Sequence, residues 1–88
     1  MVRKIKLENG FEYTIDDSVM DDAEFVDLLA DVEENPLRAG RILTWIYGKE
    51  GKKALYDHIR TKDGRVPVQA MNDAIEQTFN ALGESEKN

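Results

Sequence analysis

Turn and helix-cap signals follow one another at short intervals in the second half of this sequence. Asn35-Pro36 pairs an N-cap residue with a proline at the first helical position, and Gly48 suits the left-handed end of a helix. Asp63-Gly64 indicates a turn, and Pro67 suits the start of another helix. The expected helices of this half cover residues 36–47, about 52–61 and 67–82.

Residues 2–16 have the pattern of a β-hairpin. Asn9-Gly10, a strong turn signal, separates two runs in which apolar and polar residues alternate. A two-stranded ribbon is marginally stable alone, so its apolar side chains have to pack on helices. Those side chains are Ile5, Leu7, Phe11, Tyr13 and Ile15.

A first helix is expected to begin near Asp21 or Asp22, because Asp21 and Glu24 have the spacing of a capping box. The patterns together predict an α+β, mainly α fold, with the N-terminal hairpin packed on a bundle of about four short helices. The helical stripes predict one core: Phe25, Leu28, Leu29, Ile42, Ile46, Ile75 and Phe79.

The chain length is typical of a single domain. A chain of 88 residues builds one thin core and leaves no room for a deep, walled active site. We expect the domain to cover residues 1–83, where Gly83 closes the last helix. Residues 84–88 are then a polar C-terminal tail.

Composition disfavours several classes of function. The net charge of −6 opposes general affinity for nucleic acid and for anionic membranes. The absence of cysteine excludes disulfides, thiolate metal sites and cysteine nucleophiles. No apolar stretch is long enough for a signal peptide or a membrane span. We therefore expect a soluble, intracellular protein that binds neither nucleic acid nor membrane.

The charged residues are segregated along the chain. Residues 8–34 contain eleven acids and no Lys or Arg: Glu8, Glu12, Asp16, Asp17, Asp21, Asp22, Glu24, Asp27, Asp31, Glu33 and Glu34. In residues 38–65 the bases dominate: Arg38, Arg41, Lys49, Lys52, Lys53, Arg60, Lys62 and Arg65. Either the two regions attract each other across the domain, or they form a dipolar surface that orients a partner or a second copy.

No set of residues has the spacing that catalysis or metal binding requires. Asp63-Gly64 resembles part of a calcium loop, but Ile59 and Ala70 fall on ligand positions and offer no oxygen. His58 is the only histidine, and we expect it to be half-buried on a helix. Asp27 and Asp31 are expected on a solvated outer face. We predict no enzyme activity, no metal and no cofactor.

Trp45-Ile46-Tyr47 is the segment with the clearest sign of partner binding. Three consecutive side chains cannot share one helical stripe, so Leu43 and Tyr47 lean outward if Ile42, Trp45 and Ile46 face the core. The alternative is that the hairpin or the last helix covers all of them. The candidate partner-binding residues are Trp45, Tyr47 and Leu43 as anchors, with Arg38 and Arg41 beside them.

Several stretches resemble the tail assembly chaperone family of siphophages, from phages and prophages of Gram-positive bacteria. The resemblance spans nearly the whole chain: Ile5-Lys6-Leu7-Glu8-Asn9-Gly10-Phe11-Glu12-Tyr13, Ile15-Asp16-Asp17, Asp21-Asp22 with Phe25, Leu28 and Leu29, His58-Ile59-Arg60, Asp63-Gly64-Arg65-Val66-Pro67-Val68 with Met71, then Phe79 and Lys87-Asn88. Ala23 departs from the family, in which we expect a tryptophan in many relatives.

The resemblance implies a non-enzymatic role in building a long phage tail. Such chaperones coat the tape-measure protein and keep it soluble until tail-tube subunits polymerise around it. The implied partners are therefore the tape-measure protein and, as a second candidate, the tail-tube protein, with self-association left open. The implied location is the host cytoplasm, outside the mature virion. Two alternatives remain: another small phage structural or connector protein, and an acidic protein-binding regulator.

Overall fold

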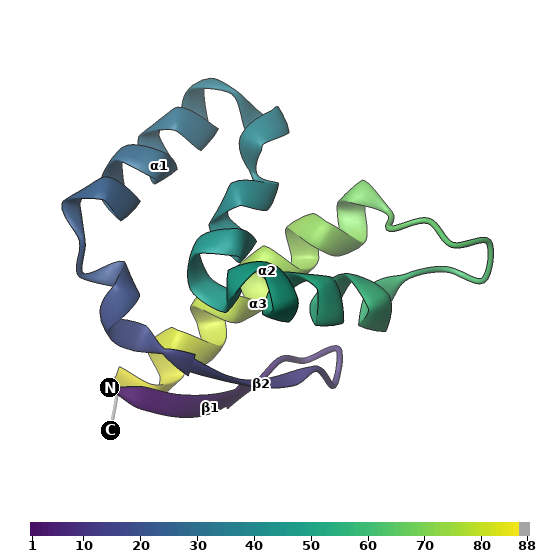
Figure 1. Cartoon of the computed structure of the whole chain (residues 1–88), viewed down its shortest axis with the longest axis horizontal. Helices are drawn as coiled ribbons and strands as arrows, with labels where there is room; N and C mark the ends of the chain where they lie inside the picture. Colours follow the sequence, from purple (N-terminus) through teal and green to yellow (C-terminus); the bar gives the residue numbers. More distant parts are fainter. Residues whose placement is uncertain (87–88) are drawn as a thin grey trace.

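A computed structural model describes residues 1–86, in which a two-stranded hairpin packs on crossing helices (Figure 1). The elements are β1 (Val2–Lys6), β2 (Glu12–Asp16), the short 3-10 helix η1 (Asp17–Met20), α1 (Ala23–Glu34), the 3-10 helix η2 (Pro36–Arg38), α2 (Gly40–Ile59) and α3 (Val68–Glu86). Helix α1 arches over one end of α2, and the hairpin lies at the other side. The α+β, mainly helical fold predicted from the sequence is confirmed.

The N-terminal hairpin has the expected antiparallel pairing. Its register places Ile5 opposite Tyr13, and the loop closes where the Leu7 amide donates to the Phe11 carbonyl at 2.8 Å. The Asn9 side chain accepts from the Phe11 amide at 2.9 Å inside that loop. Strand β1 lies against α3 and β2 against α2, so the hairpin joins the two longest helices.

Side-chain caps set the limits of α1 and η2. Asp22, rather than Asp21, caps α1, because its carboxylate accepts from the Glu24 amide at 2.8 Å. Asn35 is an N-cap with Pro36 in the first turn, as predicted, but it caps the short η2, and the helix expected from residue 36 begins only at Gly40. The resulting bend turns the chain from α1 back toward α2.

The number of helices differs from the sequence-based expectation. Within residues 1–86 the structure has three α-helices rather than about four, because the two segments expected on either side of Gly48 form the single element α2. Gly48 has the positive φ expected of it, with φ 76° and ψ 174°, and this non-helical residue divides α2 into two helical segments that meet at a kink. The helix therefore changes direction without a connecting loop.

Helix α3 runs past the residue expected to close it. Gly83 lies inside α3, which continues to Glu86, so the expectation that this glycine ends the helix is wrong. Gly83 is not among the glycines with positive φ, and a glycine with an ordinary helical backbone does not terminate a helix. Lys87 and Asn88, the end of the expected polar tail, lie outside the described residues.

The core fills the space between the hairpin and the three helices. Its buried members are Ile5, Leu7, Phe11, Ile15, Phe25, Ile42, Leu43, Ile46, Tyr47, Leu55, Ala74 and Leu82. Of the predicted core, Phe25, Ile42 and Ile46 are buried, and the other four residues pack against the cluster while remaining partly exposed. Among residues 1–86, no helix combines the length and apolar character needed to cross a membrane.

One buried hydroxyl pair ties α2 to α3. The Thr78 hydroxyl donates to the Ala74 carbonyl at 2.7 Å, so its oxygen is left to accept from the Tyr47 hydroxyl, also at 2.7 Å. Thr78 is fully buried, and burial raises the pKa of Tyr47. The pair satisfies two hydroxyl groups that water cannot reach.

We expect Thr78→Val to be more destabilising than Tyr47→Phe. The valine leaves the buried Tyr47 hydroxyl without an acceptor, which should lower the free energy of unfolding by about 1–3 kcal/mol. Tyr47→Phe removes the hydrogen bond together with its donor and leaves no unpaired hydroxyl, so it should lower the free energy of unfolding by only about 0.5–1.5 kcal/mol. Urea unfolding of the two variants and of the double variant measures both costs. A double variant that loses the full sum would show that the two hydroxyl groups act independently.

Candidate functional site

The structure buries two of the residues that the sequence suggested as anchors. Leu43 has 0% exposed surface and Tyr47 has 6%, so the expectation that they lean outward is wrong. The hairpin is the cause for Tyr47, because the rings of Phe11 and Tyr13 lie 5.9 Å from its ring. Neither side chain offers surface to a partner, and both belong to the core.

Trp45 is half-buried and holds a neighbouring segment. Its indole N–H donates to the Val19 carbonyl at 2.7 Å, which fixes η1 against α2. Its ring lies 6.0 Å from the ring of Phe25 in α1. The remaining surface of Trp45 lines an open hollow of about 500 Å³ together with Leu28, Arg41 and Thr44.

The two arginines of the predicted site are exposed beside α1. Arg38 lies 3.5 Å from the Asp31 carboxylate, whereas no acid in the described part of the chain forms an ion pair with Arg41. Arg38–Asp31 is also the only ion pair, within residues 1–86, that joins the acidic and basic regions. An exposed pair contributes about 0–1 kcal/mol, so these regions do not hold the domain together by direct contact.

A second hollow, lined mostly by apolar residues, lies where the end of α1, η2 and the start of α2 face the first half of α3. We call it the apolar groove, and its volume is about 560 Å³. Its lining residues are Val32, Pro36, Leu37, Ala39, Ile42, Val68, Met71, Asn72 and Ile75. Neither the stripe in α1 nor the stripe in α3 is covered at this point, which explains why Val32, Met71 and Ile75 remain partly exposed.

Local structure places apolar side chains on both rims of the groove. The Asn35 cap and Pro36 form a tight 3-10 turn, and this turn leaves Leu37 94% exposed. On the facing rim, Val68 begins α3 and is 69% exposed. A fully exposed leucine forgoes about 1.5–3 kcal/mol of burial free energy, which a partner covering the groove would recover.

The floor of the groove is held by a contact from α2. The Tyr56 hydroxyl donates to the Met71 sulfur at 3.2 Å, and burial raises the pKa of Tyr56. Lys52 lies over the Tyr56 ring, with its nitrogen 5.3 Å from the ring centroid. The methionine is therefore positioned by its neighbour, while its flexible thioether can adapt to an incoming apolar side chain.

His58 links the end of α2 to the hairpin loop. We expected His58 to be half-buried, but it is exposed. Its ring lies 5.6 Å from the Phe11 ring. Its Nε2 lies 2.8 Å from the Asn9 carbonyl oxygen.

The Asp63-Gly64 segment is a turn, closed by a 2.8 Å bond from the Thr61 amide to the Arg65 carbonyl. In the described part of the chain, no three acidic, His or Cys side chains are grouped to hold a metal ion.

Sequence reasoning missed the apolar groove. Its clearest signal is Leu37, an apolar residue that follows Asn35-Pro36 and lies outside the helical stripes. Comparisons with protein-family models, with curated proteins and with solved structures found no match for this chain. The site must therefore be interpreted from its own chemistry, which is that of a surface for apolar side chains.

Proposed function

We propose that this protein is a siphophage tail assembly chaperone that binds helical segments of the tape-measure protein and keeps them soluble before the tail tube polymerises. It acts without catalysis, in the host cytoplasm, and is absent from the mature virion. Two independent lines support this proposal. One is the resemblance over nearly the whole chain, and the other is an exposed apolar groove on a small acidic protein.

The observation that carries the proposal is the nearly complete exposure of Leu37 at the rim of the groove. An amphipathic helix presents apolar side chains about one turn apart, and a groove of this kind accepts such a stripe. The net charge of −6 keeps a complex with an aggregation-prone chain in solution. Arg41 and the exposed part of Trp45 supply a second contact area on α2.

Co-expression with the tape-measure protein tests the proposal. We expect the tape-measure protein to be soluble and to co-purify with the wild-type chain. We expect Leu37→Asp to weaken the complex about thirtyfold or more, as the loss of a central apolar anchor commonly does. Val26→Asp is the matched control, because Val26 is 61% exposed on α1 but does not line the groove.

The outcomes separate the function from the surface that performs it. A tape-measure protein that is equally soluble without this chain would show that the chaperone proposal is wrong. If the tape-measure protein co-purified equally well with the Leu37→Asp variant, the chaperone function would stand, but the groove would be excluded as its binding site. A connector protein or a regulator would not raise the solubility of the tape-measure protein. Gene order is a further check, because a chaperone gene is expected between the tail-tube and tape-measure genes.

A further inference from the structure

We infer that the helix bound in the apolar groove carries a carboxylate that pairs with Lys52 of α2. This inference rests on the proposed function for the source of that helix, the tape-measure protein. Asn72 is the only polar side chain among the nine lining residues, so the lining supplies hydrophobic contact, which has no direction. The register of a bound helix therefore has to come from a polar group beside the groove.

Two contacts place Lys52 beside the groove. A Cβ atom added at Gly40 would lie 3.2 Å from the Lys52 nitrogen and 3.2 Å from the Tyr56 hydroxyl oxygen, so both side chains converge on this glycine. Gly40 directly follows Ala39, a lining residue of the groove. The Tyr56 hydroxyl donates to the sulfur of Met71, a second lining residue. The ammonium group is held at this place by the face of the Tyr56 ring.

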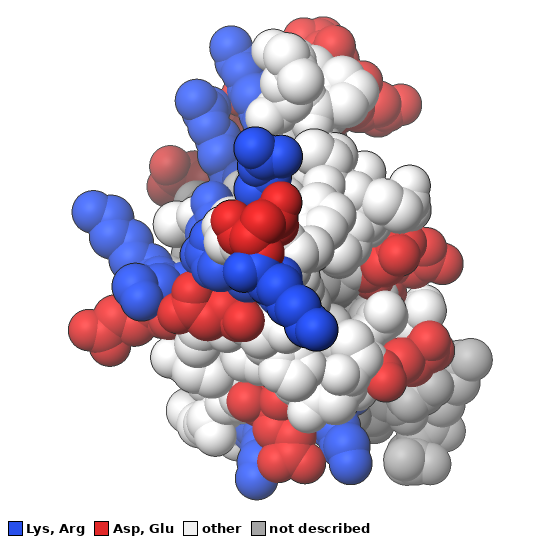
Figure 2. Space-filling model, turned by 90° about the vertical axis from the view of Figure 1, so that its right-hand side faces the viewer, with Lys and Arg blue, Asp and Glu red and all other residues white. Residues whose placement is uncertain are grey.

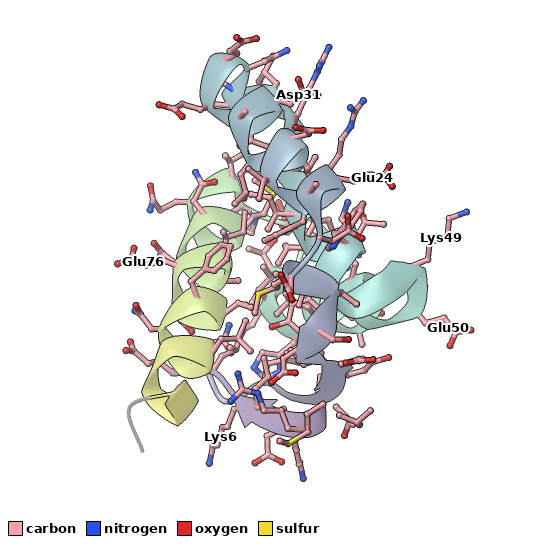
Figure 3. The ribbon with its side chains drawn as sticks, turned by 90° about the vertical axis from the view of Figure 1, so that its left-hand side faces the viewer. Lys6, Glu24, Asp31, Lys49, Glu50 and Glu76 are labelled. Carbon is pink, nitrogen blue, oxygen red and sulfur yellow. The ribbon has the colours of Figure 1, made fainter. Side chains whose placement is uncertain are left out.

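No acid balances the charge of Lys52. Among the side chains that the structure describes, those of residues 1–83, no carboxylate forms an ion pair with it. The next residue, Lys53, does form one, with Asp57 at 3.2 Å. Glu50 is the nearest acid in the sequence, and Figure 3 shows it projecting outward from α2 on the side away from α3. The half-buried ammonium group of Lys52 therefore faces an aromatic ring but no group of opposite charge.

A helix that covers the groove changes the surroundings of Lys52. It removes water from beside the ammonium group, and a desolvated cation without a partner opposes binding. A carboxylate on the helix replaces the lost water with a charge-assisted hydrogen bond, whereas a lysine at that place adds repulsion. The groove therefore favours a helix that brings an acid to Lys52.

The net charge of −6 acts against an acidic partner, but it acts over a longer range. Screening limits interactions between exposed charges to about 8 Å at physiological salt, so the charges next to the bound helix decide its preference. The bases are not mixed evenly with the acids. Figure 2 shows Lys and Arg side chains gathered toward one side of the molecule, with uncharged surface beside them. A local base can therefore attract a carboxylate although the whole protein is acidic.

Two synthetic helical peptides of about 18 residues test this inference, because that length can form a helix on its own. Both carry the same leucine stripe and the same outer face, but the positions flanking the stripe are glutamate in one and glutamine in the other. Fluorescence anisotropy with the full chain gives each Kd at about 0.15 M salt. We expect the glutamate peptide to bind about tenfold more tightly, through a close charge pair at the interface. Leu37→Asp should weaken both peptides.

Variants of two neighbouring lysines separate Lys52 from the overall charge. Lys52→Gln should make the two peptides bind equally. Lys53→Gln changes the net charge by the same amount and should keep the glutamate preference, because the Lys53 side chain is 77% exposed and pairs with Asp57. Lys52→Glu reverses the charge beside the groove, so it should lose affinity for the glutamate peptide and gain affinity for a third peptide with lysine flanks.

Three results would contradict the inference, and each has a distinct meaning. If the wild-type chain bound both peptides equally, or neither, the inference would be wrong, and the solubility of the tape-measure protein in co-expression would still decide the proposed function. Equal loss of the preference in Lys52→Gln and Lys53→Gln would assign the attraction to the overall charge and overturn the inference. If light scattering showed a dimer that Leu37→Asp converts into a monomer, the groove would belong to a second copy, and the inference would be overturned as well.

Discussion

Leu43→Ala is expected to lower the free energy of unfolding by about 2–5 kcal/mol. Leu43 is fully buried in α2, so the alanine leaves a cavity in the part of the core that the hairpin and the helices share. Domains of this size have a total stability of about 5–15 kcal/mol, and their cores are thin. The loss is therefore a large fraction of the total stability, and it should be measurable as a lower urea concentration at the midpoint of unfolding.

The same substitution at Leu37 is the control for Leu43. Leu37 is 94% exposed, so Leu37→Ala should change the stability by no more than about 0.5 kcal/mol. Urea unfolding of both variants, with the slope of the transition compared, gives the two values. Similar stability losses in the two variants, or none at Leu43, would contradict the placement of Leu43 in the core and Leu37 on the surface.

Local signals in the sequence predicted the parts of this fold that local chemistry controls. Asn9-Gly10 lies in the hairpin turn, and Asn35-Pro36 caps and starts η2. Gly48 has positive φ as its position suggested. Each of these signals acts through a hydrogen bond or a backbone preference within a few residues, so no knowledge of the distant chain was needed.

Signals that depend on the distant chain failed. A glycine permits a helix to end but does not require it, which is why α3 continues beyond Gly83. Helical periodicity identified one buried stripe in α2 but could not show how many sides of the helix are covered. The hairpin covers a further side, and this buries Tyr47.

The candidate site could be predicted only in part for the same reason. Trp45, Arg38 and Arg41 keep some exposed surface, whereas Leu43 and Tyr47 do not. The apolar groove requires the end of α1 and η2 to meet α3, and the whole of α2 separates α3 from them in the sequence. Only that arrangement brings Leu37 and Val68 together as lining residues of one groove.

Gly51→Ala is expected to destabilise the protein by about 1–3 kcal/mol, although alanine normally favours a helix. A Cβ atom at Gly51 would lie 2.7 Å from a ring carbon of Tyr13 and 2.8 Å from the Cβ of Tyr47. The Tyr13 ring is stacked on Phe11 and meets Tyr47 edge-on, so it has little freedom to move. The variant must therefore push the hairpin away from α2.

Gly83→Ala is the matched control, and we expect the opposite sign. Gly83 lies inside α3, and a Cβ atom there would meet nothing within 4 Å. Alanine should thus raise the stability by about 0.4–1 kcal/mol through its helix propensity and the smaller entropy of the unfolded chain. Thermal unfolding of both variants should give melting temperatures on opposite sides of the wild-type value. If Gly51→Ala also raised the melting temperature, the close approach of the hairpin to α2 would be excluded. Replacing glycine with alanine stabilises a helix only where the added Cβ atom has free space.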